Sequence, residues 1–180
     1  DNCGTITMAI DTNTFTCSDI GENPVVFTVT DAAGLTSTCN VLVTVEDTLA
    51  PVVSCQDITV ILDANNQADI TVADIDTGST DNCGVVSYSL DVTNFDCSML
   101  GENTVTLSVT DIHGNVGTCS AVVTVLDNEL PVAICQSITV ELDANGFALI
   151  TPEDLDAGSS DNCINFTTSV DIVTFDCSNL

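Results

Sequence analysis

Carboxylates and cysteines are the residues of this chain that could do chemistry. The 180 residues include 27 Asp plus Glu and ten Cys, with one His and no Lys or Arg, which gives a formal net charge of −27. Such a chain has no cation to displace counterions from phosphate, so nucleic acid is excluded as a partner. The acidic residues are dispersed among apolar ones, and 44% of all residues are hydrophobic. The composition therefore indicates a folded protein rather than a disordered polyanion.

If the chain folds as repeated β-sandwich units, acidic residues gather at one end of each unit. Carboxylate and amide oxygens that converge at a joint suit Ca²⁺ better than a transition metal. The alternative is that these residues are ordinary turn residues, because Asp and Asn side chains bond the local backbone and no EF-hand loop is present. The candidate ligands are Asp47, Asp74, Asp76, Asp81, Asn82 and Asp111, followed by Asp127, Asp154, Asp156 and Asp161.

The positions of these residues follow a fixed period. A signature that begins Asp-Asn-Cys occurs at Asp1, again at Asp81 and again at Asp161. Residues 1–50 align without gaps with 81–130 at 22 of 50 identical positions, and 51–100 align with 131–180 at 28 of 50. A period of this kind, here about 80 residues, indicates repeated modules. Cutting at the prolines predicts the C-terminal part of one repeat at 1–50, a complete repeat at 51–130 and the N-terminal part of the next at 131–180. We expect the chain to be a piece of a longer protein.

Apolar and polar residues alternate with the period of β-strands in the complete repeat. The alternation covers residues 58–62, 68–72 and 85–90, and two longer strands are expected at 103–110 and 118–125, joined by a hairpin at 111–115. No helical periodicity competes with this pattern. Six or seven short strands predict an immunoglobulin-like β-sandwich. The joint between repeats is short and ends in Pro51, so we expect tandem sandwiches in an end-to-end, semi-rigid rod.

Cysteines at recurring intervals indicate a disulfide framework and a location outside the reducing cytosol. Four cysteines in one repeat permit three connectivities. We expect a bridge between the first and last strands, Cys55–Cys119, and local bridges Cys3–Cys17, Cys83–Cys97 and Cys163–Cys177, with Cys39 and Cys135 paired outside this sequence. The alternative pairs Cys39–Cys55 and Cys119–Cys135 would place their partners about one repeat apart in a rod, of order 40 Å, which is too far for a bridge.

Catalytic patterns are missing from the sequence. It contains no Ser/His/Asp arrangement, phosphate-binding loop or CxxC pair. His113 is expected at a hairpin tip, and its counterpart one period earlier is Ala33. Paired carboxylates also serve glycosidases, but such enzymes need one dedicated site, whereas these acidic positions recur in each copy. We therefore expect no enzyme activity.

The unit resembles the HYR-like (hyalin repeat) family of immunoglobulin-like modules. The resembling stretches are residues 50–60, the Asp81-Asn82-Cys83-Gly84 signature, residues 109–115 and Thr118-Cys119, with Val29–Gly34 closer still to the family form. The amino-acid sequence of residues 95–98 and 100–103 is similar to that of tandem repeats in giant surface proteins of Bacteroidetes-type gliding and predatory bacteria. The resemblance implies export by type IX secretion and a role as an adhesin or filament. Two departures are Gln56 after Cys55 and Ile164 in place of glycine.

Together these features predict a structural and adhesive segment of a long extracellular fibre on a bacterial surface. The expected partners are neighbouring repeats, identical chains packed laterally in a filament, and the surface to which the cell attaches. Membrane insertion is not expected, because no apolar run approaches about 18 residues. The alternative is a Ca²⁺-dependent carbohydrate-binding module, although one Tyr and no Trp leave few aromatic platforms for sugars.

Overall fold

The chain folds as an all-β protein whose sheets have a sandwich-like arrangement, as predicted. The computed structural model describes residues 4–163, 166–176 and 178. Two compact units are present, and each draws on more than one period of the sequence. The first combines residues up to 55 with 76–90 and 106–120, and the second combines 56–75 and 91–105 with residues from 121 onward.

In the first unit, a three-stranded antiparallel sheet has the order β1-β2-β3. It comprises β1 (Thr7–Ile10), β2 (Gly21–Thr30) and β3 (Thr36–Val45), with the short 3₁₀ helix η1 (Cys17–Asp19) between β1 and β2. The β2–β3 hairpin turns at Asp31, whose Oδ1 accepts the backbone N–H groups of Ala33 and Leu35 at 2.9 and 2.8 Å. An Asp that bonds the backbone N–H groups just ahead of it is a typical hairpin-turn device.

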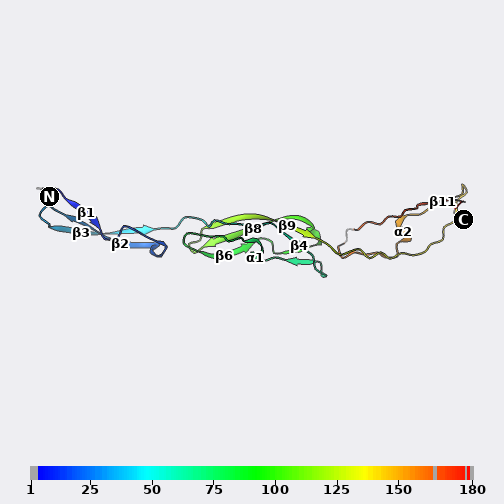
Figure 1. The fold of residues 1–180 in the computed structure, drawn as a ribbon, viewed down its shortest axis with the longest axis horizontal. Coiled ribbons are helices and arrows are strands. Elements are labelled where there is room, and N and C mark those ends of the chain that lie inside the picture. The colour runs from blue at the N-terminus through cyan, green and yellow to red at the C-terminus, as the bar shows by residue number, and fades with distance from the viewer. Residues whose placement is uncertain (1–3, 164–165, 177, 179–180) are drawn as a thin grey trace. The chain divides into compact units, whose positions relative to one another are not determined.

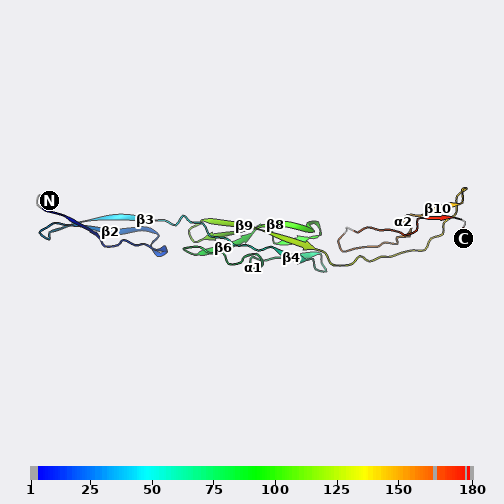
Figure 2. The ribbon, with the colours of Figure 1, turned by 45° about the horizontal axis from the view of Figure 1, so that its top comes forward.

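A four-stranded sheet with the order β4-β9-β8-β6 is formed largely by the two longest strands of the chain (Figures 1 and 2). Its strands are β4 (Ile58–Ile61), β6 (Val85–Leu90), β8 (Gly101–Asp111) and β9 (Val116–Leu126). The pair β4–β9 is parallel and the pair β6–β8 is antiparallel. The long strands, expected at 103–110 and 118–125, extend slightly beyond the predicted ends.

The core follows the alternation along β8 and β9. Every second residue is buried, and the side chains of Val105, Leu107, Val109 and Val123 are fully inaccessible to solvent. Burial of such side chains contributes about 1.5–3 kcal/mol each relative to exposure. The Thr and Ser residues between them on β8 face outward. The period-two pattern in the sequence therefore corresponds to a sheet with one buried face.

In the second unit, two small antiparallel sheets repeat one design at positions one period apart. One pairs β5 (Gln67–Asp69) with β7 (Asn94–Asp96), and the other pairs β10 (Phe147–Leu149) with β11 (Thr174–Asp176). Phe95 lies opposite Ala68, and its equivalent Phe175 lies opposite Ala148. Because both copies have the same register, the period of the sequence is also a period of the local structure.

Helices are the elements that the sequence analysis missed. Each of α1 (Val72–Ile75) and α2 (Pro152–Leu155) is a single turn, and η2 (Cys97–Met99) repeats η1. One turn is too short to display a period of 3.6, but it can be recognised by its N-cap. Thr71 donates its backbone N–H and its hydroxyl to Asp74 at 2.7 Å each, and Thr151 bonds Asp154 through the same two groups. None of the described helices is long and apolar enough to cross a membrane.

The three disulfides described correct the predicted pairing. Cys55 is bonded to Cys119, as expected. The local bridge Cys83–Cys97 is wrong, because Cys83 is bonded to Cys17 and Cys97 to Cys163. Cys83 precedes β6 and Cys97 follows β7, and these two strands do not pair with each other, since β6 pairs with β8 and β7 pairs with β5.

The same bonds also exclude two further predicted pairs. The pairs Cys3–Cys17 and Cys163–Cys177 are wrong, because Cys17 is bonded to Cys83 and Cys163 is bonded to Cys97. Cys3 and Cys177 themselves lie outside the described residues. Cys39 and Cys135 are free and exposed. Their pairing with cysteines outside this sequence stays a prediction, and the alternative pairs Cys39–Cys55 and Cys119–Cys135 are not formed.

Candidate functional site

Three segments that are far apart in the sequence meet after β3. They are the joint at residues 46–51, the signature at 81–84 and the β8–β9 hairpin tip at 111–115. The Cys17–Cys83 bridge, with a Cα–Cα distance of 5.4 Å, ties the signature to η1 of the preceding period. The N-terminus of η1 is closed by a capping box between Thr16 and Asp19, and the hydrogen bonds from Thr16 lower the pKa of Asp19.

Three carboxylates meet at this joint, and we call Asp47, Asp81 and Asp111 the carboxylate cluster. One oxygen from each lies within 4.8 Å of the other two. Asp111 is 1% exposed and the side chain of Asp47 is 3% exposed. Buried carboxylates at such distances repel one another unless a proton, a cation or hydrogen-bond donors compensate, and the chain has no Lys or Arg to do so.

Asp111 is the most heavily bonded member of the cluster. Its Oδ1 accepts the backbone N–H groups of His113 and Asn115 at 2.8 Å each, and its Oδ2 accepts Asn115 Nδ2 at 2.7 Å. Burial opposes ionisation of this carboxyl, but the side-chain bond from Asn115 and the backbone bonds from Asn115, His113 and Gly114 outweigh it and lower the pKa of Asp111. Asp111 is therefore held as an anion at the hairpin tip.

Asp81 and Asn82 connect the signature to the cluster. Asp81 Oδ1 accepts the N–H groups of Cys83 and Gly84 at 2.8 and 3.1 Å, which fixes the turn that carries the bridged cysteine. Asn82 Nδ2 donates to Asp47 Oδ1 at 3.4 Å. Asp81 is thus a turn residue, as the turn interpretation expects, and it also lies close to Asp47 and Asp111. Its role as a cation ligand stays a prediction.

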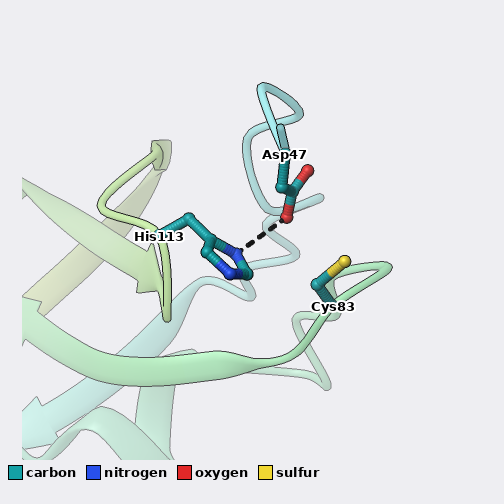
Figure 3. Close-up of side chains that lie close together, drawn as sticks. All are labelled: Asp47, Cys83 and His113. Carbon is teal, nitrogen blue, oxygen red and sulfur yellow. Dashed lines mark hydrogen bonds and ion pairs between the residues drawn. The ribbon is translucent and has the colours of Figure 1, made fainter. Parts of the chain in front are cut away.

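His113 adds a contact that the sequence analysis did not anticipate. Its Nδ1 lies 3.2 Å from Asp47 Oδ2, and Cys83 lies beside the pair (Figure 3). Asp47, Cys83 and His113 are close enough to hold an ion in common, but the Cys83 sulfur is bonded to Cys17 and is no thiolate ligand. The His113 contact has no counterpart one period earlier, where Ala33 occupies the position.

The next joint repeats part of this arrangement. Asn162 Nδ2 donates to Asp127 Oδ1 at 3.1 Å, as Asn82 does to Asp47. The Cys97–Cys163 bridge again has a Cα–Cα distance of 5.4 Å. Asn66 Nδ2 donates to the backbone oxygen of Asn162 at 3.0 Å. The Oδ1 atoms of Asp161, Asn162 and Asn66 are buried without a hydrogen-bond partner.

The remaining predicted ligands are used locally. Asp74 and Asp154 cap α1 and α2. Asp76 Oδ1 accepts the backbone N–H and hydroxyl of Ser79, and Asp156 Oδ1 accepts the N–H of Ser159 at 2.8 Å. Hydrogen bonds from the side chains and backbones of Thr71, Ser79 and Ser159 lower the pKa of Asp74, Asp76 and Asp156, respectively. The turn interpretation describes these four side chains, and the cluster retains Asp47, Asp81 and Asp111.

The donor set of the cluster fits a hard cation. Its side-chain donors are carboxylate oxygens, of the type that Ca²⁺ prefers, and the side chains of Asp47 and Asp111 are largely buried. A cation there would offset the negative charge of three carboxylates in a chain that has no Lys or Arg. Cys83, which lies beside these carboxylates, is bonded to Cys17 and adds no thiolate to the donor set.

Comparisons with known proteins give little further information. No family model and no curated protein sequence matches the chain. Solved structures with some similarity include protocadherin gammaB7 EC3-6 in a cis-dimer, with 18% identity and a TM-score of 0.39 over 76% of this chain. Another is protocadherin gamma B7 extracellular cadherin domains 1-4, with 12% identity and a TM-score of 0.38 over 84% of this chain. The chain spans 44% and 47% of the length of those two proteins.

Proposed function

We propose that this chain is a structural segment of a long extracellular repeat fibre that holds an attachment region away from a bacterial surface. The observation that carries the proposal is the recurrence of one disulfide at two positions one period apart, Cys17–Cys83 and Cys97–Cys163. A bond that links each period to the next is useful to an extended, load-carrying array. It also requires an oxidising location.

Repetition of the surface supports a spacer rather than a recognition module. The joint bonds Asn82–Asp47 and Asn162–Asp127 recur, as do the β5–β7 and β10–β11 sheets. A dedicated binding site would appear once, whereas a spacer is built from equivalent parts. The absence of Lys and Arg from the sequence also leaves trypsin-like proteases no site to cut, which suits a protein exposed outside the cell.

The test of the spacer proposal is an attachment assay on cells that display the whole protein. Deleting one complete period should reduce reach in proportion to length, and replacing it with an unrelated rigid module of equal length should restore attachment. Loss of attachment after the replacement would contradict the proposal, because it would show that this surface itself recognises a target. A glycan array on the same chain addresses the carbohydrate-binding alternative, for which the proposal expects no specific signal.

Calcium at the joint stays a prediction, now narrowed to the carboxylate cluster. We expect Ca²⁺ to raise the melting temperature of the chain and a chelator to lower it, because the ion would hold the three segments of the joint together. Asp111→Asn should abolish this response, whereas Asp31→Asn, at the equivalent position one period earlier, should leave it intact. No calorimetric binding at millimolar Ca²⁺ would contradict the prediction.

A further inference from the structure

The two bridges between periods divide the chain in a regular way. Cys17–Cys83 and Cys97–Cys163 have the same sequence separation of 66. Their loops follow one another without overlap, and only the short segment from Cys83 to Cys97 separates them. Within one period, therefore, the cysteine that is bonded to the preceding period and the cysteine that is bonded to the following one lie close together along the chain.

We propose that these bonds create a short covalent path through the protein, in which a disulfide, the segment from Cys83 to Cys97, and the next disulfide follow in series. Tension applied along the array passes through this segment, which contains β6 and β7. The remainder of each period lies in a closed loop that the bridges shield from the pull. The proposal deepens the proposed function, because a short path is useful only to a protein that carries tension.

Chain geometry sets how far such an array can stretch. A whole period of about 80 residues could reach ~270 Å if it unravelled completely. With both bridges intact, one period can contribute only the segment from Cys83 to Cys97, or ~50 Å. The array is then almost inextensible even if its sheets melt, because the limit is covalent and does not depend on hydrogen bonds.

The third bridge has a different role. Cys55–Cys119 has a sequence separation of 64, and its loop overlaps the loops of both other bridges. The path from Cys17 to Cys163 does not pass through it. Cys55–Cys119 therefore stabilises the fold without shortening the path. This difference supplies a matched control, since two disulfides of nearly equal loop length are expected to differ completely in their mechanical effect.

The experiment is single-molecule stretching of the oxidised full chain, tethered at its two ends. The unmodified chain should reach a contour length of ~160 Å, equivalent to about 47 residues, and a reductant should extend it to ~600 Å. Cys55→Ala/Cys119→Ala should leave the oxidised length unchanged. Cys17→Ala/Cys83→Ala should lengthen it by ~150 Å, less than the full loop because Cys55–Cys119 then shortens the new path.

Contour length at high force does not depend on whether a variant is folded, so a destabilised variant still gives an answer. An oxidised length near twice the expected value, or a longer chain after removal of Cys55 and Cys119, would overturn the inference. These outcomes are independent of the attachment assay. A chain that stretches as expected but gives no reach-dependent attachment would contradict the proposed function alone.

Discussion

At the scale of single residues, the acidic side chains have separate roles that their spacing in the sequence does not reveal. Asp74 and Asp154 cap helices, Asp76 and Asp156 hold turns, and Asp111 holds a hairpin tip within the carboxylate cluster. Sequence spacing groups them because the expected topology places them at one end of each repeat. Spacing alone cannot separate them, because their hydrogen-bond donors are backbone N–H groups and nearby side chains whose directions depend on the local turn.

Asp111 gives a prediction about pH. Its pKa is lower in the folded chain than the ordinary value of 3.8, so its contribution to stability is complete above that value and is lost as the pH falls through the folded pKa. We expect Asp111→Asn to reduce stability at neutral pH and to make the loss of stability below about pH 4 less steep. Thermal unfolding across this pH range measures the effect. Exposed Glu102→Gln is the control, and an equal slope in both variants would contradict the assignment.

At the scale of elements, the alternation of residues predicts strands well and their pairing poorly. The positions of β4, β6, β8 and β9 follow from period-two patterns, because one face of each strand is buried. The pairing of β6 with β8 and of β7 with β5 depends on contacts between distant segments, which no local pattern encodes. The wrong local disulfide Cys83–Cys97 followed directly from the missing knowledge of that pairing.

The buried face of β8 gives a prediction about stability. Leu107→Ala removes a fully buried side chain and should lower the free energy of unfolding by about 2–5 kcal/mol. Val116→Ala, on β9 at a position that is 54% exposed, should change it by less than about 0.5 kcal/mol. Urea denaturation of both variants measures the difference. Similar losses in the two variants would show that the predicted inner face of the sheet is wrong.

Gly117 gives a second prediction at this scale, because β9 passes very close to the joint there. A Cβ at Gly117 would collide with the backbone oxygen of Pro51 and with the Val53 side chain, so the backbone of the joint must move to accommodate any other residue. We expect Gly117→Ala to lower the melting temperature and to speed amide exchange at residues 50–53. Gly114→Ala is the control, because an added Cβ there meets no atom and the substitution strains only the backbone of the hairpin turn. It should leave amide exchange at residues 50–53 unchanged. Unchanged exchange in Gly117→Ala would contradict the close approach.

At the scale of the whole molecule, a net charge of −27 must be accommodated without any Lys or Arg. Like charges repel within a Debye length, which shortens from about 30 Å at 0.01 M salt to about 8 Å at 0.15 M. We expect the melting temperature to rise steadily with NaCl over this range and to rise more steeply with CaCl₂ at equal ionic strength. Equal effects of the two salts would indicate screening alone and would contradict cation binding at the cluster.

Disulfides that link each period of the sequence to the next distinguish this fold from a string of separately bridged modules, and disulfide mapping of the non-reduced chain by mass spectrometry tests them. The chain has no site for trypsin, so a protease that cuts at Asp and Glu is used, and its sites include Asp91 between Cys83 and Cys97. The structure predicts linked peptides that join Cys17 to Cys83, Cys97 to Cys163 and Cys55 to Cys119. A linked pair of peptides that joins Cys83 to Cys97 would contradict it.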